Sequence, residues 1–99
     1  MRVEMAQVTI DEFRRRALRL SGQTLLTLRG RRPFRVDVVP EGLTIAPSSS
    51  GVERHVGWPE IDRFLLHFNT TGSLTPAHYH ALTFNSSYLV ALMKALTSP

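Results

Sequence analysis

The most regular stretch of this sequence is FRVDVVPEGLTI, residues 34–45. In its first half, apolar side chains alternate with charged ones at a period of two, which is typical of a strand with one buried face. Pro40-Glu41-Gly42 is a tight-turn signal, and Leu43-Thr44-Ile45 then resumes the apolar pattern. The stretch therefore predicts two antiparallel strands joined by a tight turn.

One further strand is expected on each side of this hairpin. Residues 24–29 also alternate at a period of two, and residues 30–33 form a short connection that contains a glycine and a proline. On the other side, the serine-rich residues 48–51 separate the hairpin from a strand at about residues 52–56. Because parallel strands need long crossover connections, these short ones predict a four-stranded antiparallel meander.

One helix is expected before the four strands in the sequence, and a second one directly after them. Thr9 and Glu12 have the spacing of a capping box, which predicts a helix at residues 10–20. Pro59 suits the first turn of a second helix, because proline there loses only an amide that has no partner. Trp58 precedes this helix, and we expect it to cover the end of the core, the alternative being a stacking or anchoring residue.

A third helix is expected near the end of the sequence. Residues 73–82 should form a loop with one helical turn, and Asn85-Ser86-Ser87 should cap a helix at residues 88–96. We therefore predict a single small α+β domain over residues 1–99, in the order α-β-β-β-β-α-α. Its four-stranded antiparallel meander should carry the three helices on one face.

Length and composition agree with one small core. A chain of 99 residues is the size of one domain, and its 42% hydrophobic and 20% charged residues are near globular averages. The absence of cysteine excludes disulfides, thiolate metal sites and cysteine nucleophiles. The longest apolar run, Tyr88 to Met93, is far too short for a membrane span, and no secretion signal is seen. We expect a cytoplasmic protein without membrane contact.

Basic residues are concentrated in the first third of the chain. Residues 1–35 hold nine arginines and three acids, a net charge of +6, whereas residues 36–99 hold three basic and five acidic residues, a net charge of −2, so the total is +4. Eleven of the twelve basic residues are arginine. This preference suits bidentate phosphate contacts, but a GC-rich genome explains it equally well.

Histidines form the one group that resembles metal ligands. His78 and His80 lie two residues apart in the predicted loop, with His67 and His55 elsewhere in the chain. No pair of ligands has the helical spacing of a zinc site, and solvated imidazoles are ordinary in loops. We expect neither a metal nor another cofactor.

No pattern indicates an enzyme. Ser48-Ser49-Ser50 has no assignable base or orienting group, as a nucleophile requires. The acidic residues fit solvated faces rather than a pair in an apolar cleft, and no two glycines are close enough to cradle a phosphate. We therefore predict a protein without catalytic residues.

Four arginines lie on the first predicted hairpin and its tip: Arg29, Arg31, Arg32 and Arg35. If the strand apolar residues face the helices, Arg29 and Arg35 share the opposite sheet face. Such a basic hairpin can contact phosphates or enter a major groove, which makes nucleic acid a candidate partner. The alternative is a solvated face whose charges prevent strands from adding to one another. The apolar strand residues expected to face the helices are Leu26, Leu28, Phe34, Val36 and Val38.

The last predicted helix is apolar almost all round, so it is either sandwiched in the core or partly buried against another subunit. The second case favours a small non-enzymatic adaptor that binds a protein partner or a second copy of itself as a homodimer. We place this function first and nucleic-acid binding as the alternative. The predicted interaction surface is Tyr88, Leu89, Leu92, Met93 and Leu96.

Overall fold

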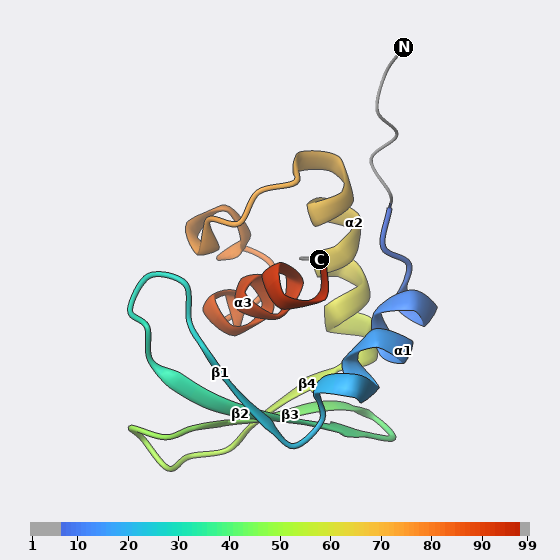
Figure 1. The fold of residues 1–99 in the computed structure, drawn as a ribbon. Helices are drawn as coiled ribbons and strands as arrows, with labels where there is room; N and C mark the ends of the chain where they lie inside the picture. Colours follow the sequence, from blue (N-terminus) through green and yellow to red (C-terminus); the bar gives the residue numbers. More distant parts are fainter. Residues whose placement is uncertain (1–6, 98–99) are drawn as a thin grey trace.

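A computed structural model describes residues 7–97 of the chain. Its element order confirms the predicted α+β class, with a single 3-10 turn in the loop before the last helix (Figure 1). The predicted residues 1–6 and 98–99 of the domain lie outside the described part. The elements are α1 (Ile10–Leu20), β1 (Gln23–Leu26), β2 (Pro33–Val39), β3 (Gly42–Pro47), β4 (Arg54–Gly57), α2 (Trp58–Thr71), η1 (Pro76–Tyr79) and α3 (Ser86–Thr97).

The predicted central hairpin is formed by β2 and β3. The strands are antiparallel, and Val39 pairs with Gly42, so only Pro40 and Glu41 remain in the connection. The sheet order is β1-β2-β3-β4, with antiparallel pairing throughout, which confirms the meander. All three helices lie above one face of the sheet (Figure 1).

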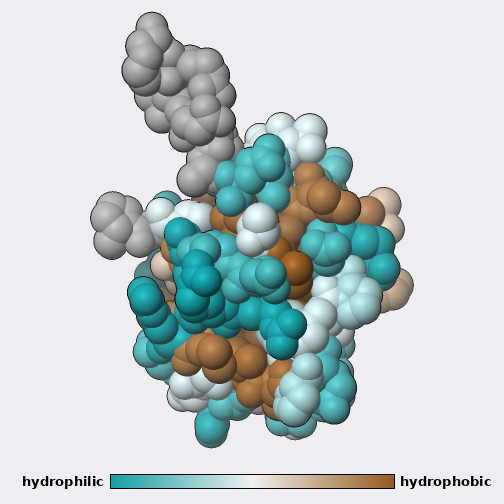
Figure 2. All heavy atoms as spheres, turned by 90° about the vertical axis from the view of Figure 1, so that its right-hand side faces the viewer, coloured by the Kyte–Doolittle hydropathy of each residue, from teal (hydrophilic) through white to brown (hydrophobic). Residues whose placement is uncertain are grey.

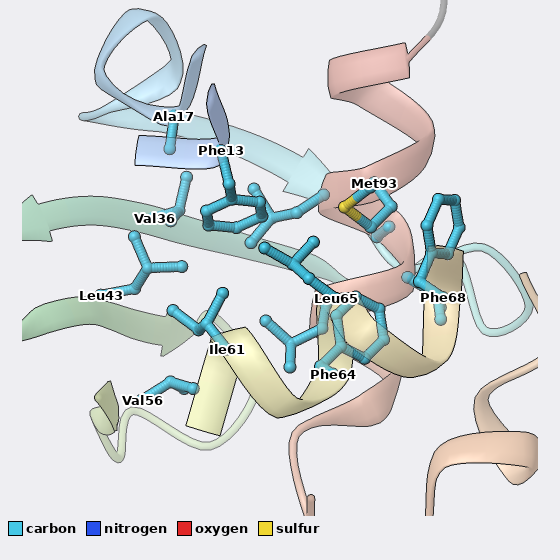
Figure 3. Packing of buried hydrophobic residues seen from close by; sticks show 14 of the residues in the cluster. Phe13, Ala17, Val36, Leu43, Val56, Ile61, Phe64, Leu65, Phe68 and Met93 are labelled. Atoms are coloured by element: carbon cyan, nitrogen blue, oxygen red, sulfur yellow. The ribbon is translucent and has the colours of Figure 1, made fainter. Parts of the chain in front are cut away.

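The core lies between this face of the sheet and the helices. Phe34 and Val36 from β2 are fully buried, as are Leu43 and Ile45 from β3, which is the alternation expected of strands with one covered face. Phe13 of α1 and side chains from α2 and α3 close over them (Figure 3). No buried side-chain polar atom in residues 7–97 lacks a hydrogen-bond partner.

The first helix begins as the capping-box spacing predicts. Thr9 Oγ1 accepts a hydrogen bond from the Glu12 amide at 3.1 Å. Farther along, Asn69 of α2 holds the segment before α1 by donating to the Val8 carbonyl and accepting from the Val8 amide, at 3.0 and 2.9 Å. This amide pair ties the start of the described chain to the second helix.

The predicted faces of the first strand are wrong. β1 ends at Leu26, and Leu25 rather than Leu26 pairs with Phe34 on the core face. Leu26 is 43% exposed, and Leu28 and Arg29 belong to the loop that follows. Leu28 nevertheless packs against the core, as expected for it. Successive strand residues point to opposite faces, so a shift of one residue exchanges the two faces of the whole strand.

Trp58 covers the end of the core next to the β2–β3 turn. Its indole Nε1 donates to the Pro40 carbonyl at 2.8 Å, and its amide donates to the Glu41 carbonyl at 3.0 Å. These bonds join the start of α2 to the hairpin, and the ring packs against the core. The packing role expected for Trp58 is confirmed.

None of the helices in residues 7–97 is long and apolar enough to cross a bilayer.

Substitution of Gly42 tests the close approach between β3 and β4. An added Cβ at Gly42 would lie 2.8 Å from Gly57 Cα and would overlap the Val56 carbonyl oxygen. Gly42→Ala should therefore lower the free energy of unfolding by about 3 kcal/mol, measured by urea denaturation. Gly51→Ala is the control: Gly51 also has a positive φ, 68°, but open space around it, so its loss should be only about 1 kcal/mol. Equal losses in the two variants would contradict the steric explanation.

Candidate functional site

The loop that joins β1 to β2 is held by its own hydrogen bonds. The Thr27 amide donates to the Arg32 carbonyl at 3.0 Å, and the Arg31 amide donates to the Thr27 carbonyl at 3.1 Å. The buried Thr27 Oγ1 accepts from the Arg32 amide at 3.0 Å. A loop closed at its base in this way presents Arg29, Arg31 and Arg32 from a defined backbone.

Arg31 has a left-handed backbone conformation, with φ of 52°. It is the one non-glycine residue with positive φ in residues 7–97. A non-glycine side chain at this φ costs about 1–2 kcal/mol, and glycine is the residue that usually fills such a position in a tight loop. Backbone strain of this kind is concentrated at functional sites, which makes the tip of this loop a candidate site.

A hollow of about 420 Å³ lies beside this loop. Three segments that are far apart in the sequence enclose it: the β1–β2 loop, the β3–β4 region and the start of α3. In Figure 1 the β1–β2 loop rises beside α3 on the left. The size falls within the range of ligand pockets. The lining residues are Thr27, Gly30, Arg32, Pro33, Pro47, Ser49, Ser50, Arg54, Phe84, Ser87 and Tyr88.

The charged residues that line the hollow are both basic. Arg32 and Arg54 are its charged lining residues, and no acidic residue lines it. The ion pairs seen in residues 7–97 join Glu12 to Arg15 and Arg16, and Asp37 to Arg35, so they leave Arg32 and Arg54 without a carboxylate. Two guanidinium groups with no carboxylate partner are suited to an anionic ligand.

Aromatic packing positions Arg54. Its guanidinium lies over the Tyr88 ring, 5.5 Å from the centroid, and the Tyr88 ring packs edge-on against Phe34 with 5.0 Å between centroids. Phe34 is fully buried, so the contact chain runs from the core to the hollow. The cation is therefore held at the hollow by a ring that is itself anchored.

Phe84 lies at the same hollow and is 95% exposed. Its two neighbours are buried: Thr83 is 5% exposed and Asn85 is 8% exposed. The Thr83 hydroxyl donates to Glu60 Oε2, and Asn85 Nδ2 donates to the same oxygen at 3.3 Å. Because both flanking side chains turn inward to Glu60, the phenyl ring of Phe84 is held outward.

The structure separates the four hairpin arginines. Arg32 lines the hollow, and Arg29 and Arg31 are exposed in the loop above β1 and β2. Arg35 lies on the uncovered face of the sheet, where its Nε is 3.1 Å from Asp37 Oδ2. The expectation that Arg29 and Arg35 share a sheet face is wrong, because the strand ends before Arg29.

The surface predicted on the last helix is also corrected. Leu89, Leu92 and Met93 are fully buried within the chain, and Tyr88 and Leu96 are half-buried. α3 contacts α1, β1 and η1, so its apolar circumference is covered by the domain itself. The sandwiched alternative considered for this helix is the one found, and the three leucine and methionine side chains are unavailable to a partner of the folded domain.

Arginines on α1 have structural contacts. Arg16 donates to the Leu96 carbonyl at 3.2 Å and to Glu12 at 2.8 Å, and Arg14 lies 4.8 Å from the centre of the Trp58 ring. Figure 2 shows this side of the molecule, with hydrophilic side chains over much of it and hydrophobic areas between them. These arginines support the helix packing and lie on another side from the hollow.

The histidines do not converge. Within residues 7–97, no group of three histidine or acidic side chains could hold a metal ion. His78 shares a 2.6 Å hydrogen bond with the Ser73 hydroxyl, and His67 packs edge-on against the buried Tyr79. Tyr79 in turn donates to the Ser73 carbonyl at 2.6 Å, so these contacts hold the loop before α3 on α2.

Sequence reasoning found Arg32 but missed Arg54 and Phe84. Arg54 stands alone in a weak strand pattern, and only folding brings it to the hairpin tip. Phe84 does carry a signal, because it is a single aromatic residue between the polar Thr83 and Asn85. No family model matches the chain, and neither does any curated protein or solved structure in the comparisons.

The conformation of Arg31 leads to a stability prediction. Arg31→Gly should raise the free energy of unfolding by about 0.5 kcal/mol, because relief at positive φ exceeds the entropy that glycine adds to the unfolded chain. Arg29→Gly in the same loop should instead lower it by about 0.5 kcal/mol, since Arg29 does not have a positive φ. Denaturant unfolding of both variants is the measurement, and a loss of stability in Arg31→Gly would show that Arg31 is not strained.

Proposed function

We propose that this chain is a non-enzymatic nucleic-acid-binding module that holds backbone phosphates at the hollow between the β1–β2 loop and α3. The observation that carries the proposal is the meeting of Arg32 and Arg54, from distant parts of the chain, in a hollow with no acidic lining residue. Guanidinium groups bind phosphate oxygens through two parallel hydrogen bonds. Phosphate contacts of this kind supply most of the affinity in non-specific nucleic-acid binding.

The surroundings of the hollow support an extended anion rather than a small one. Arg29 and Arg31 are exposed in the adjoining loop, so they can add phosphate contacts beside the hollow. Ser49, Ser50 and Ser87 place hydroxyl groups along its wall. The net charge of +6 in residues 1–35 attracts a polyanion from a distance. A cytoplasmic location belongs to this proposal, because the ligand is met inside the cell.

A charge-matched pair of double variants tests the proposal. Arg32→Ala/Arg54→Ala should weaken binding of labelled DNA, and the slope of log K against log salt should fall by about 1.4 for a single strand, because each arginine neutralises one phosphate. Fluorescence anisotropy against single-stranded and duplex DNA at several salt concentrations gives both values. The double variant should remain folded, because both arginines are exposed.

Arg19→Ala/Arg63→Ala is the control for this experiment. It removes the same formal charge from exposed positions on α1 and α2, and neither residue lines the hollow. This control should keep the wild-type slope. Absence of binding at low salt, or equal losses of affinity in the two double variants, would contradict a phosphate site at the hollow.

A protein-binding or self-associating adaptor is the second hypothesis. In the sequence this hypothesis is based on α3, but the apolar residues of α3 are covered by the domain itself. The exposed Leu18, Leu26 and Leu66 lie on three different elements, so they offer no obvious shared surface for a partner. We therefore expect a monomer by size exclusion with light scattering, at concentrations up to the millimolar range. A salt-resistant dimer would instead favour the adaptor hypothesis.

A further inference from the structure

We propose that the hollow takes an unpaired nucleotide, with the base stacked on the Phe84 ring and the neighbouring phosphates held by Arg32 and Arg54. The ligand class is thus single-stranded nucleic acid. The inference rests on the proposed function and adds to it the form of the nucleic acid.

The exposure of Phe84 is determined by the contacts of its two neighbours. A phenyl ring that is 95% exposed is unusual in a folded domain, where large apolar side chains are normally covered. Here the chain on both sides is fixed, since Thr83 and Asn85 are buried and both donate to Glu60. The Asn85 carbonyl also accepts the first amide bonds of α3, from Tyr88 and Leu89. The backbone on both sides of the ring is therefore held in place.

The composition of the hollow favours a nucleotide over an apolar peptide. Of its eleven lining residues two are arginines and five carry hydroxyl groups, namely Thr27, Ser49, Ser50, Ser87 and Tyr88. An apolar segment would supply no hydrogen-bond acceptor for the two guanidinium groups. A nucleotide supplies a flat apolar base for the ring and charged oxygens for the guanidinium groups within the same short distance.

Stacking on Phe84 requires a base with a free face. In a duplex both faces of every base are covered by its neighbours, so an aromatic side chain at a groove cannot stack on them. A single strand exposes its bases, and a phenyl ring accepts any of the four because every base has a π-face. The site should therefore prefer single strands and discriminate little between sequences.

The experiment uses strands of equal charge that differ in their bases. A labelled oligothymidine, an abasic strand of the same length and a duplex are titrated into the full chain at low salt. Wild-type protein should bind oligothymidine about 5- to 150-fold more tightly than the abasic strand, the range that one stacked base gives. A uridine RNA strand of the same length distinguishes the two sources of the ligand. Tighter binding of uridine assigns RNA, tighter binding of thymidine assigns DNA, and equal binding assigns single strands of either kind.

Phe84→Ala should abolish the preference for thymidine over the abasic strand and leave abasic binding unchanged. Phe84→Trp should retain the preference, because tryptophan also stacks. Leu66→Ala is the matched control: it shortens another exposed apolar side chain, 65% exposed on α2, at a place that does not line the hollow. Circular dichroism checks that all three variants are folded, as expected for exposed positions.

The outcomes separate this inference from the proposed function. If thymidine, abasic and duplex strands bind equally and Phe84→Ala changes nothing, stacking is overturned while the arginine site stands. If no strand binds at low salt, both proposals fail. If the thymidine preference is lost in Phe84→Ala but kept in Phe84→Trp and Leu66→Ala, the result supports stacking on Phe84 and, with it, the nucleic-acid site.

Discussion

The apolar face of the β2–β3 hairpin determines how the rest of the chain is arranged. Phe34 and Val36 lie beside Leu43 and Ile45 on one side of the sheet, and leaving them in water would cost roughly 1.5–3 kcal/mol for each side chain. The sheet is only four strands wide and its other face is uncovered. All three helices are therefore needed on the same face, and each contributes side chains to a single core (Figure 3).

This requirement explains why the last helix is not a free surface. The apolar side chains of α3 are buried against α1, β1 and η1, so the helix closes the core above the β1 edge of the sheet. Its position has a second effect, because it brings the start of the helix to the tip of the β1–β2 loop. The candidate site is a consequence of core packing: the residues that form it are joined by no sequence motif.

Polar contacts then set the details of the site. Glu60 at the start of α2 holds Thr83 and Asn85, which fixes both the beginning of α3 and the outward direction of Phe84. Tyr88 lies between the buried Phe34 and the Arg54 guanidinium. The charged and aromatic groups of the hollow are thus supported by rigid elements, which reduces the entropy that a ligand would have to remove.

Local patterns in the sequence were sufficient for the order of elements, the tight turn at Pro40-Glu41 and the cap at Thr9, because each depends on neighbouring residues alone. They failed for β1, where two adjacent leucines fit either face and only pairing with Phe34 selects Leu25. Of the site, sequence reasoning found Arg32 alone, and for the same reason it could not assemble the rest. Arg32, Arg54 and Phe84 are separated by more than twenty residues from one another, and only the packing of α3 against the sheet brings them to one hollow.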